Sequence, residues 1–116
     1  MPLDQKALDE LRALDPDGSA GILAQVIASY VDDTASIFTK LGHAITVGDV
    51  PTMTREAHSL KSTSRSVGAL KLGDLAAAME QVGRSGKLDG CAAMLDALKA
   101  EYASVESELL AAGKPA

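Results

Sequence analysis

The chain has 116 residues, and its 11 Lys and Arg residues against 16 Asp and Glu residues give a formal net charge of −5. This length fits a single domain over residues 1–116 and leaves no room for a second catalytic domain. The charge balance argues against nucleic-acid binding, which requires a clustered Lys and Arg surface, and no apolar run reaches the roughly 18 residues of a membrane span.

The composition favours helices, since alanine occurs 20 times and only three residues are aromatic. A short first helix is predicted from apolar residues at helical spacing, namely Leu3, Ala7, Leu11 and Leu14. The following Asp15-Pro16-Asp17-Gly18 ends it, because Pro and Gly stop helices. The acidic N-terminal segment lacks the pattern of a secretory signal, so we expect a soluble, cytoplasmic protein.

A long second helix is predicted over about residues 20–47, with Ser19 as its N-cap and Gly48 as its end. Its apolar positions recur every three or four residues from Ile22 to Ile45, which is the period of a helix with one buried face.

Three further helices are predicted over about residues 50–66, 69–84 and 90–112. Asp49 is the expected N-cap of the first of these, and Pro51 is tolerated in its first turn. Connections this short make neighbouring helices antiparallel. The expected fold is therefore all-α, an antiparallel up-down-up-down four-helix bundle with a short additional N-terminal helix.

Several chemically distinctive side chains are expected to be structural. Cys91 lies on an apolar stripe and is expected to be a small core residue. Because it is the only cysteine, disulfides and cysteine-built zinc sites are excluded. Tyr30, Phe38 and Tyr102 are expected to fill the core, with the tyrosine hydroxyls reaching solvent. His43 has no supporting context and is expected to be solvated.

Known catalytic and metal-binding motifs do not occur in the sequence. The two histidines, His43 and His58, stand in no spacing that predicts a metal site, and no Gly-rich phosphate loop or nucleophile elbow is present. We therefore expect no bound metal and no nucleotide site.

His58 lies at the edge of the apolar face of its predicted helix. At 100° per residue it stands roughly 120° from the centre of that face, on the solvent side of the core edge. Its neighbours one or two turns away are the small or cationic residues Thr54, Lys61, Ser62 and Arg65. An exposed histidine in such surroundings is, by itself, most often only a solvated side chain.

Glu80 has the matching position on the next predicted helix, at the same angle and about the same height, because positions 58 and 80 are equidistant from the turn at 69. The two side chains are therefore predicted to form a hydrogen bond. A carboxylate on one imidazole nitrogen fixes the tautomer and leaves the outward nitrogen as a nucleophile. Lys61 could then neutralise an anion attached there, so the three residues suit the acceptance of a phosphoryl group.

The segment around His58 is Ala57-His58-Ser59-Leu60-Lys61-Ser62-Thr63-Ser64, and it is followed by Gly68, Leu72, Leu75, Met79 and Glu80. It closely resembles the signature of histidine-containing phosphotransfer (HPt) domains, H-x-L-K-G-x-S followed by a glycine and L-x-x-x-x-x-L-E. The motif itself covers residues 57–83, and the helix pattern and length are compatible over the whole chain.

The resemblance implies a role for each matching residue. His58 would be the phosphoacceptor, Lys61 would steady the phosphoryl oxygens, Glu80 would orient His58, and Gly68 would be the structural glycine of the turn. HPt domains usually have a glycine where this chain has Ser62. We expect docking to survive this change and Ser62 to narrow the choice of partner or to bond the phosphoryl group.

The resemblance also implies the partners. The chain would receive a phosphoryl group from the phospho-aspartate of a response-regulator receiver domain and pass it to another receiver, with a hybrid histidine kinase as a further partner. Thr54, Ser62, Arg65 and Arg84 would face the receiver. No cofactor is expected on this chain, and Mg²⁺ is expected in the partner receiver. It would be a monomeric phosphoryl carrier without its own ATP site. The initiating Met and the short C-terminal end favour a free-standing protein over a domain cut from a larger kinase.

Two alternatives remain open from the sequence. One is the dimerisation and phosphoacceptor hairpin of a histidine kinase, whose pattern resembles H-E-[LI]-[RK]-T-P. Here Ser59 follows the histidine and Thr63 takes the place of the proline. The other alternative is an adaptor bundle with no phosphoryl chemistry.

Overall fold

Five helices follow one another along the chain, and the computed structural model describes residues 3–14 and 21–112, in which no strand occurs. The helices are α1 (Gln5–Ala13), α2 (Ile22–Val47), α3 (Val50–Ser66), α4 (Leu70–Arg84) and α5 (Cys91–Ala112). The predicted all-α class and the short extra N-terminal helix are confirmed.

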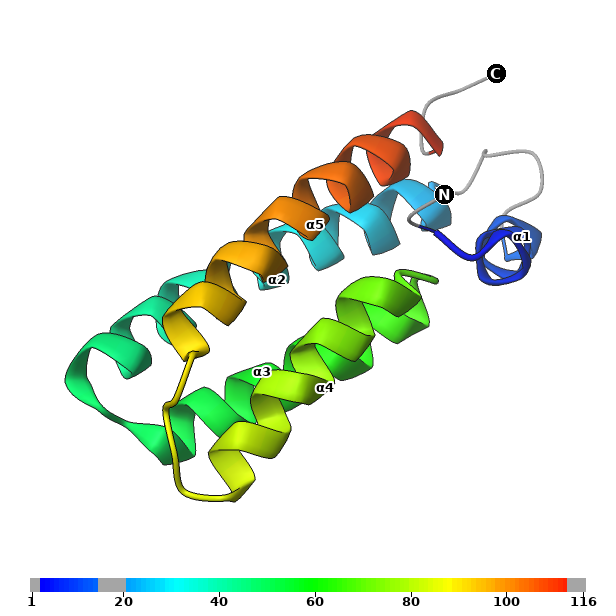
Figure 1. The fold of residues 1–116 in the computed structure, drawn as a ribbon. Helices are drawn as coiled ribbons and strands as arrows, with labels where there is room; N and C mark the ends of the chain where they lie inside the picture. The colour runs from blue at the N-terminus through cyan, green and yellow to red at the C-terminus, as the bar shows by residue number, and fades with distance from the viewer. Residues whose placement is uncertain (1–2, 15–20, 113–116) are drawn as a thin grey trace.

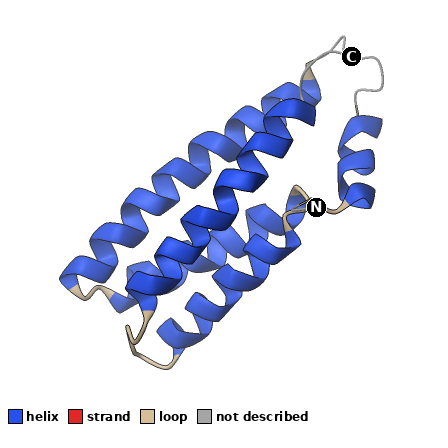
Figure 2. Cartoon of the chain, turned by 45° about the horizontal axis from the view of Figure 1, so that its top comes forward, coloured by secondary structure: helices blue, strands red, loops and turns tan. Residues whose placement is uncertain are grey.

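The four long helices form an antiparallel bundle. Helix α2 packs against α3, α3 against α4 and α4 against α5, and α5 returns to pack against α2. Figure 1 shows α2 and α5 side by side, the α3–α4 hairpin opposite them, and α1 at one end of the bundle. The short loops that reverse the chain at the ends of the bundle are visible in Figure 2. The predicted up-down-up-down topology is thus confirmed.

Helix α3, which carries His58, has a well-defined start. The carboxylate of Asp49 accepts hydrogen bonds from the Thr52 backbone N–H at 3.1 Å and from the Thr52 hydroxyl at 2.6 Å. These bonds lower the pKa of Asp49 below its usual value. The predicted N-cap is therefore confirmed, as is the end of α2 at Gly48, where the backbone is left-handed with φ of 79°.

Some predicted boundaries differ from the structure. Helix α2 begins at Ile22, because Gly21 stands at its N-cap in a left-handed conformation. The predicted cap Ser19, the predicted stop over residues 15–18 and the tail 113–115 lie outside the described residues. Leu14, predicted to be on the buried stripe, is 59% exposed because α1 ends one residue before it.

One hydrophobic core runs along the inside of the bundle. Its fully buried members include Leu41, Leu60, Leu72, Met79 and Leu98. Cys91 is also fully buried, as predicted, and burial raises the pKa of its thiol. His43 is exposed, as predicted.

The prediction that the tyrosine hydroxyls reach solvent is wrong for both tyrosines. Tyr30 is buried, and its hydroxyl lies 2.8 Å from the hydroxyl of Ser64 inside the bundle. The hydroxyl oxygen of Tyr102 is buried as well, and this burial raises the pKa of Tyr102. The rings form one cluster in which Tyr102 packs against both Tyr30 and Phe38. This packing draws the rings inward with their hydroxyls.

Gly68 joins α1 to the turn between α3 and α4. Its backbone has φ of 84°, a left-handed conformation that favours glycine. Its carbonyl accepts a hydrogen bond from the Asp4 backbone N–H at 2.6 Å, and a Cβ at this position would lie only 2.9 Å from the Cβ of Ala7. A side chain here would therefore push α1 away from the bundle.

Candidate functional site

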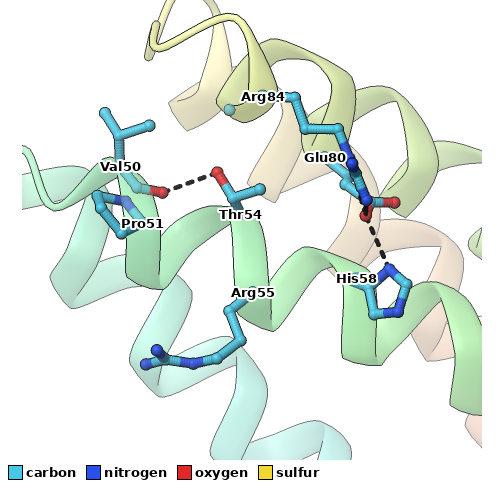
Figure 3. Close-up of a pocket in the computed structure, with 8 residues that line it drawn as sticks. Val50, Pro51, Thr54, Arg55, His58, Glu80 and Arg84 are labelled. Atoms are coloured by element: carbon cyan, nitrogen blue, oxygen red, sulfur yellow. Dashed lines mark hydrogen bonds and ion pairs between the residues drawn. The ribbon is translucent and has the colours of Figure 1, made fainter.

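His58 projects from the middle of α3 with 55% of its side chain exposed. Its Nδ1 lies 2.7 Å from Oε2 of Glu80, which comes from the facing helix α4. The predicted pairing across the two helices is therefore present. Figure 3 shows the other ring nitrogen of His58 turned away from Glu80.

Glu80 receives donors on both carboxylate oxygens. Lys61 Nζ donates to Oε1 at 2.5 Å, and Arg84 donates to Oε2 through Nη2 at 2.8 Å and Nε at 3.2 Å. Only 1% of the Glu80 side chain is exposed, because these groups and His58 close over it. Sequence analysis placed Glu80 on the solvent-facing flank of its helix, and the structure corrects this to a buried position.

The ionisation of Glu80 determines what His58 can do. The hydrogen bond from Lys61 is the main cause that lowers the pKa of Glu80 to about 2, and it outweighs the opposing effect of burial. Glu80 is therefore a carboxylate near neutral pH and can only accept hydrogen bonds. The bond must then come from Nδ1–H of His58, and a neutral ring in this tautomer carries its lone pair on the outward Nε2.

An open groove of about 510 Å³ adjoins this cluster, and it is formed by the first turns of α3 and the end of α4 (Figure 3). Its lining is Val50, Pro51, Thr54, Arg55, His58, Glu80, Gly83 and Arg84. The Thr54 hydroxyl donates to the carbonyl of Val50 at 2.8 Å, so its proton is used within α3. The exposed face of the imidazole is thus reached from an open surface.

The other predicted site residues lie apart from this cluster. Arg65 pairs with Asp74 at 3.2 Å instead of with Glu80. Ser62 is exposed, and its carbonyl accepts a bond from the Ser66 hydroxyl at 3.1 Å. The receiver-facing roles predicted for these two residues stay predictions.

Sequence analysis missed the link between Arg84 and Glu80. It named Arg84 only as a receiver-facing residue, although the spacing of four positions on one helix is the signal for such an ion pair. It also missed the contribution of Val50 and Pro51 to the groove, for which the sequence gives no signal.

The described part of the chain contains no group of three or more His, Cys, Asp and Glu side chains placed to hold a metal ion. Within the same residues, no helix is long and apolar enough to cross a bilayer.

Comparison with known families assigns the chain to a family. The model of the Hpt domain matches residues 25–108, a segment that includes both His58 and Glu80. The chain belongs to the Hpt domain family. Hpt domains are histidine phosphotransfer modules of phosphorelays, phosphoryl carriers that lack an ATP-binding kinase site. The resemblance inferred from the motif around His58 is thereby confirmed.

Individual relatives agree with this assignment. The Hpt domain is 26% identical over 103 residues to histidine-containing phosphotransfer protein 2 of Arabidopsis thaliana, and the match covers 86% of this chain and 66% of that protein. The chain thus spans just under two thirds of the length of this curated relative.

Solved structures show the same fold. Histidine-containing phosphotransfer protein B of Pseudomonas aeruginosa superposes with a TM-score of 0.88 at 24% identity, covering 97% of this chain and 94% of that one. A histidine-containing phosphotransfer protein from maize superposes with a TM-score of 0.84 at 24% identity, covering 96% of this Hpt domain and 86% of the maize chain. The bundle is therefore the Hpt fold.

Proposed function

We propose that His58 is the phosphoacceptor of this Hpt domain and that it relays a phosphoryl group between receiver domains. The observation that carries this proposal is the 2.7 Å hydrogen bond from Nδ1 of His58 to the ionised Glu80, which leaves Nε2 exposed as a nucleophile. The only other histidine of the sequence, His43, stands on a different helix, α2.

The proposed step is a phosphoryl transfer without loss of a proton. The Nε2 lone pair of His58 attacks phosphorus, the bond between phosphorus and the aspartyl oxygen of the donor breaks, and the aspartate leaves as a carboxylate. The Nδ1 proton stays on the ring, which becomes positively charged. Glu80 stabilises this charge through the existing hydrogen bond. Transfer to the next receiver reverses the same steps.

Lys61 and the partner supply the remaining electrostatics. Lys61 lies one turn from His58, and a cation there would stabilise the phosphoryl oxygens. The acidic pocket of the receiver would supply Mg²⁺ and would meet a site that already carries Lys61 and Arg84. We further propose that this chain acts in the cytoplasm as a monomer, with receiver domains and a hybrid histidine kinase as its partners.

The test is transfer of labelled phosphate from a panel of phosphorylated receivers to the wild type, to His58→Ala and to the matched control His43→Ala. We expect the wild type and His43→Ala to take label and His58→Ala to take none. Label that persists in His58→Ala would assign the wrong residue. Absence of label in the wild type with every receiver would instead favour an adaptor bundle.

The mass of the protein in solution distinguishes this proposal from the histidine-kinase hairpin. Such a hairpin completes its four helices by pairing two chains, whereas this chain supplies α2 to α5 by itself. We therefore expect the mass of one chain in solution. A stable dimer would contradict the monomeric arrangement.

A further inference from the structure

Arg84 and His58 share one oxygen of Glu80. Nη2 and Nε of Arg84 donate to Oε2 at 2.8 and 3.2 Å, and Nδ1 of His58 bonds the same atom at 2.7 Å. Lys61 alone bonds the other oxygen, Oε1. The two cations on Glu80 are therefore not equivalent, because one lies on the oxygen that orients the histidine and the other does not.

We infer that Arg84 is a positioning residue: it holds the Glu80 carboxylate against His58 and so leaves Lys61 free to turn to the phosphoryl group. This inference rests on the proposed function, since it concerns how His58 is prepared to accept phosphate. Arg84 would therefore act through Glu80 instead of through contact with a receiver.

The burial of Glu80 is the first reason. A carboxylate that is 1% exposed needs a compensating charge, because removing the partner of a buried charge is strongly destabilising. In the proposed reaction Lys61 must leave Oε1 to reach the phosphoryl oxygens. If Lys61 were the only cation on Glu80, its departure would leave the carboxylate unpaired. Arg84 remains on Oε2 and removes this obstacle.

The geometry of Arg84 is the second reason. Arg84 is the last residue of α4 and stands four positions after Glu80, so both side chains lie on the same face of one helix. Two nitrogens of its planar guanidinium bond Oε2, which restrains the carboxylate more firmly than a single ammonium would. A carboxylate fixed in this way keeps its acceptor directed at Nδ1 of His58 and so selects the tautomer of the neutral ring in which the lone pair lies on Nε2.

Arg12 provides a matched control. It is an arginine of similar exposure, 47% against 58% for Arg84, and it also pairs with an acidic residue of its own helix, Asp9, at 3.9 Å. That carboxylate is itself exposed, however. Substitution of Arg12 removes the same charge from the chain without touching Glu80.

The experiment uses phosphoramidate, a small donor that needs no docking surface. Nε2 of His58 attacks its phosphorus, the P–N bond breaks, and ammonia leaves. We expect Arg84→Gln to react on the order of tenfold more slowly than the wild type because the carboxylate is no longer held in place. Arg84→Lys should react at an intermediate rate and Arg12→Gln at the wild-type rate.

A spectroscopic readout separates positioning from a loss of stability. In ¹⁵N NMR spectra of the folded proteins, we expect wild-type His58 to show the Nδ1–H tautomer and Arg84→Gln to show a mixture of both tautomers. In the Glu80→Gln background, Arg84→Gln should cause little further loss of rate, since there is no carboxylate left to hold. Arg84→Lys keeps the test valid if the glutamine variant fails to fold.

Three results would overturn the inference. The first is an unchanged phosphoramidate rate in Arg84→Gln together with slower transfer from receivers, which would make Arg84 a docking residue. The second is an unchanged tautomer of His58 in Arg84→Gln. The third is fully additive losses of rate in the double variant of Glu80→Gln and Arg84→Gln. Failure of the proposed function gives a different result, namely a folded wild type that takes no phosphoryl group on His58 from either donor.

Discussion

Glu80 is almost fully buried, yet its Oε2 lies 2.7 Å from Nδ1 of His58, whose side chain is 55% exposed. One hydrogen bond thus connects the interior of the bundle with the surface where chemistry is proposed. Since Lys61 and Arg84 hold the buried Glu80 carboxylate in place, its hydrogen bond gives the exposed His58 ring a defined orientation. Changes at Glu80 should therefore alter both reactivity and stability.

Removal of the Glu80 side chain should slow phosphoryl transfer. We expect Glu80→Ala to lower the initial rate of label transfer from a phosphorylated receiver on the order of 100-fold, because His58 loses its orienting acceptor. Glu80→Gln should lose less, since its amide oxygen can still accept the bond from Nδ1–H. Initial rates at equal receiver concentration measure this. Equal losses of transfer rate in Glu80→Ala and Glu80→Gln would show that the hydrogen bond to Nδ1 does not determine the rate.

Glu80 should also make stability depend on pH in acid. Its pKa is lowered from 4.5 to about 2, mainly by Lys61, so its stabilising contribution is fully present above about pH 4.5 and is lost as pH falls through about 2. After allowance for solvent screening around the exposed His58 and Arg84, we expect Glu80 to contribute roughly 1–2 kcal/mol to the free energy of unfolding near neutral pH.

Urea unfolding of the wild type and Glu80→Gln between pH 7 and pH 2 measures this contribution. The difference in the free energy of unfolding should shrink in the acid range. The exposed residue Asp96 gives the control Asp96→Asn, whose difference from the wild type should change much less over the same range. A difference for Glu80→Gln that stays constant down to pH 2 would contradict the lowered pKa.

The hydrogen bond between Tyr30 and Ser64 should contribute to stability in a way that a double variant reveals. Their oxygens lie 2.8 Å apart in the core, so removing either hydroxyl leaves the other without this partner. We expect Tyr30→Phe and Ser64→Ala each to lower the free energy of unfolding by about 1–2 kcal/mol. The double variant should lose less than the sum of the two, as measured by thermal or urea unfolding. Strict additivity would mean that the pair is not coupled.

Gly68 should be needed to dock α1. Gly68→Ala places a Cβ in a left-handed backbone and against Ala7, so we expect a loss of about 1–3 kcal/mol and faster amide hydrogen exchange in α1. Gly86→Ala is the control, because Gly86 has a similar φ of 79° but no atom within 4 Å of the added Cβ. Equal losses of stability in the two variants would mean that backbone strain alone explains the effect and that the contact with α1 has no role.

The sequence by itself determined the helices and the pairing of His58 with Glu80. The apolar period places residues around each helix axis, and the short α3–α4 turn fixes which positions face each other at equal height. Local signals were equally informative at Asp49 and Gly48, because an N-cap and a left-handed helix end depend only on residues close in sequence.

Only the tertiary structure decided which side chains are buried and which charges share a partner. An angle on one helix says nothing of how far a long side chain from the next helix reaches, so Glu80 was expected on the rim and is covered by His58, Lys61 and Arg84. In the same way, the Tyr30 hydroxyl was expected in solvent and meets Ser64 inside the bundle. Burial and ion pairing depend on the packing of several helices at once, and that packing is set by all their side chains together.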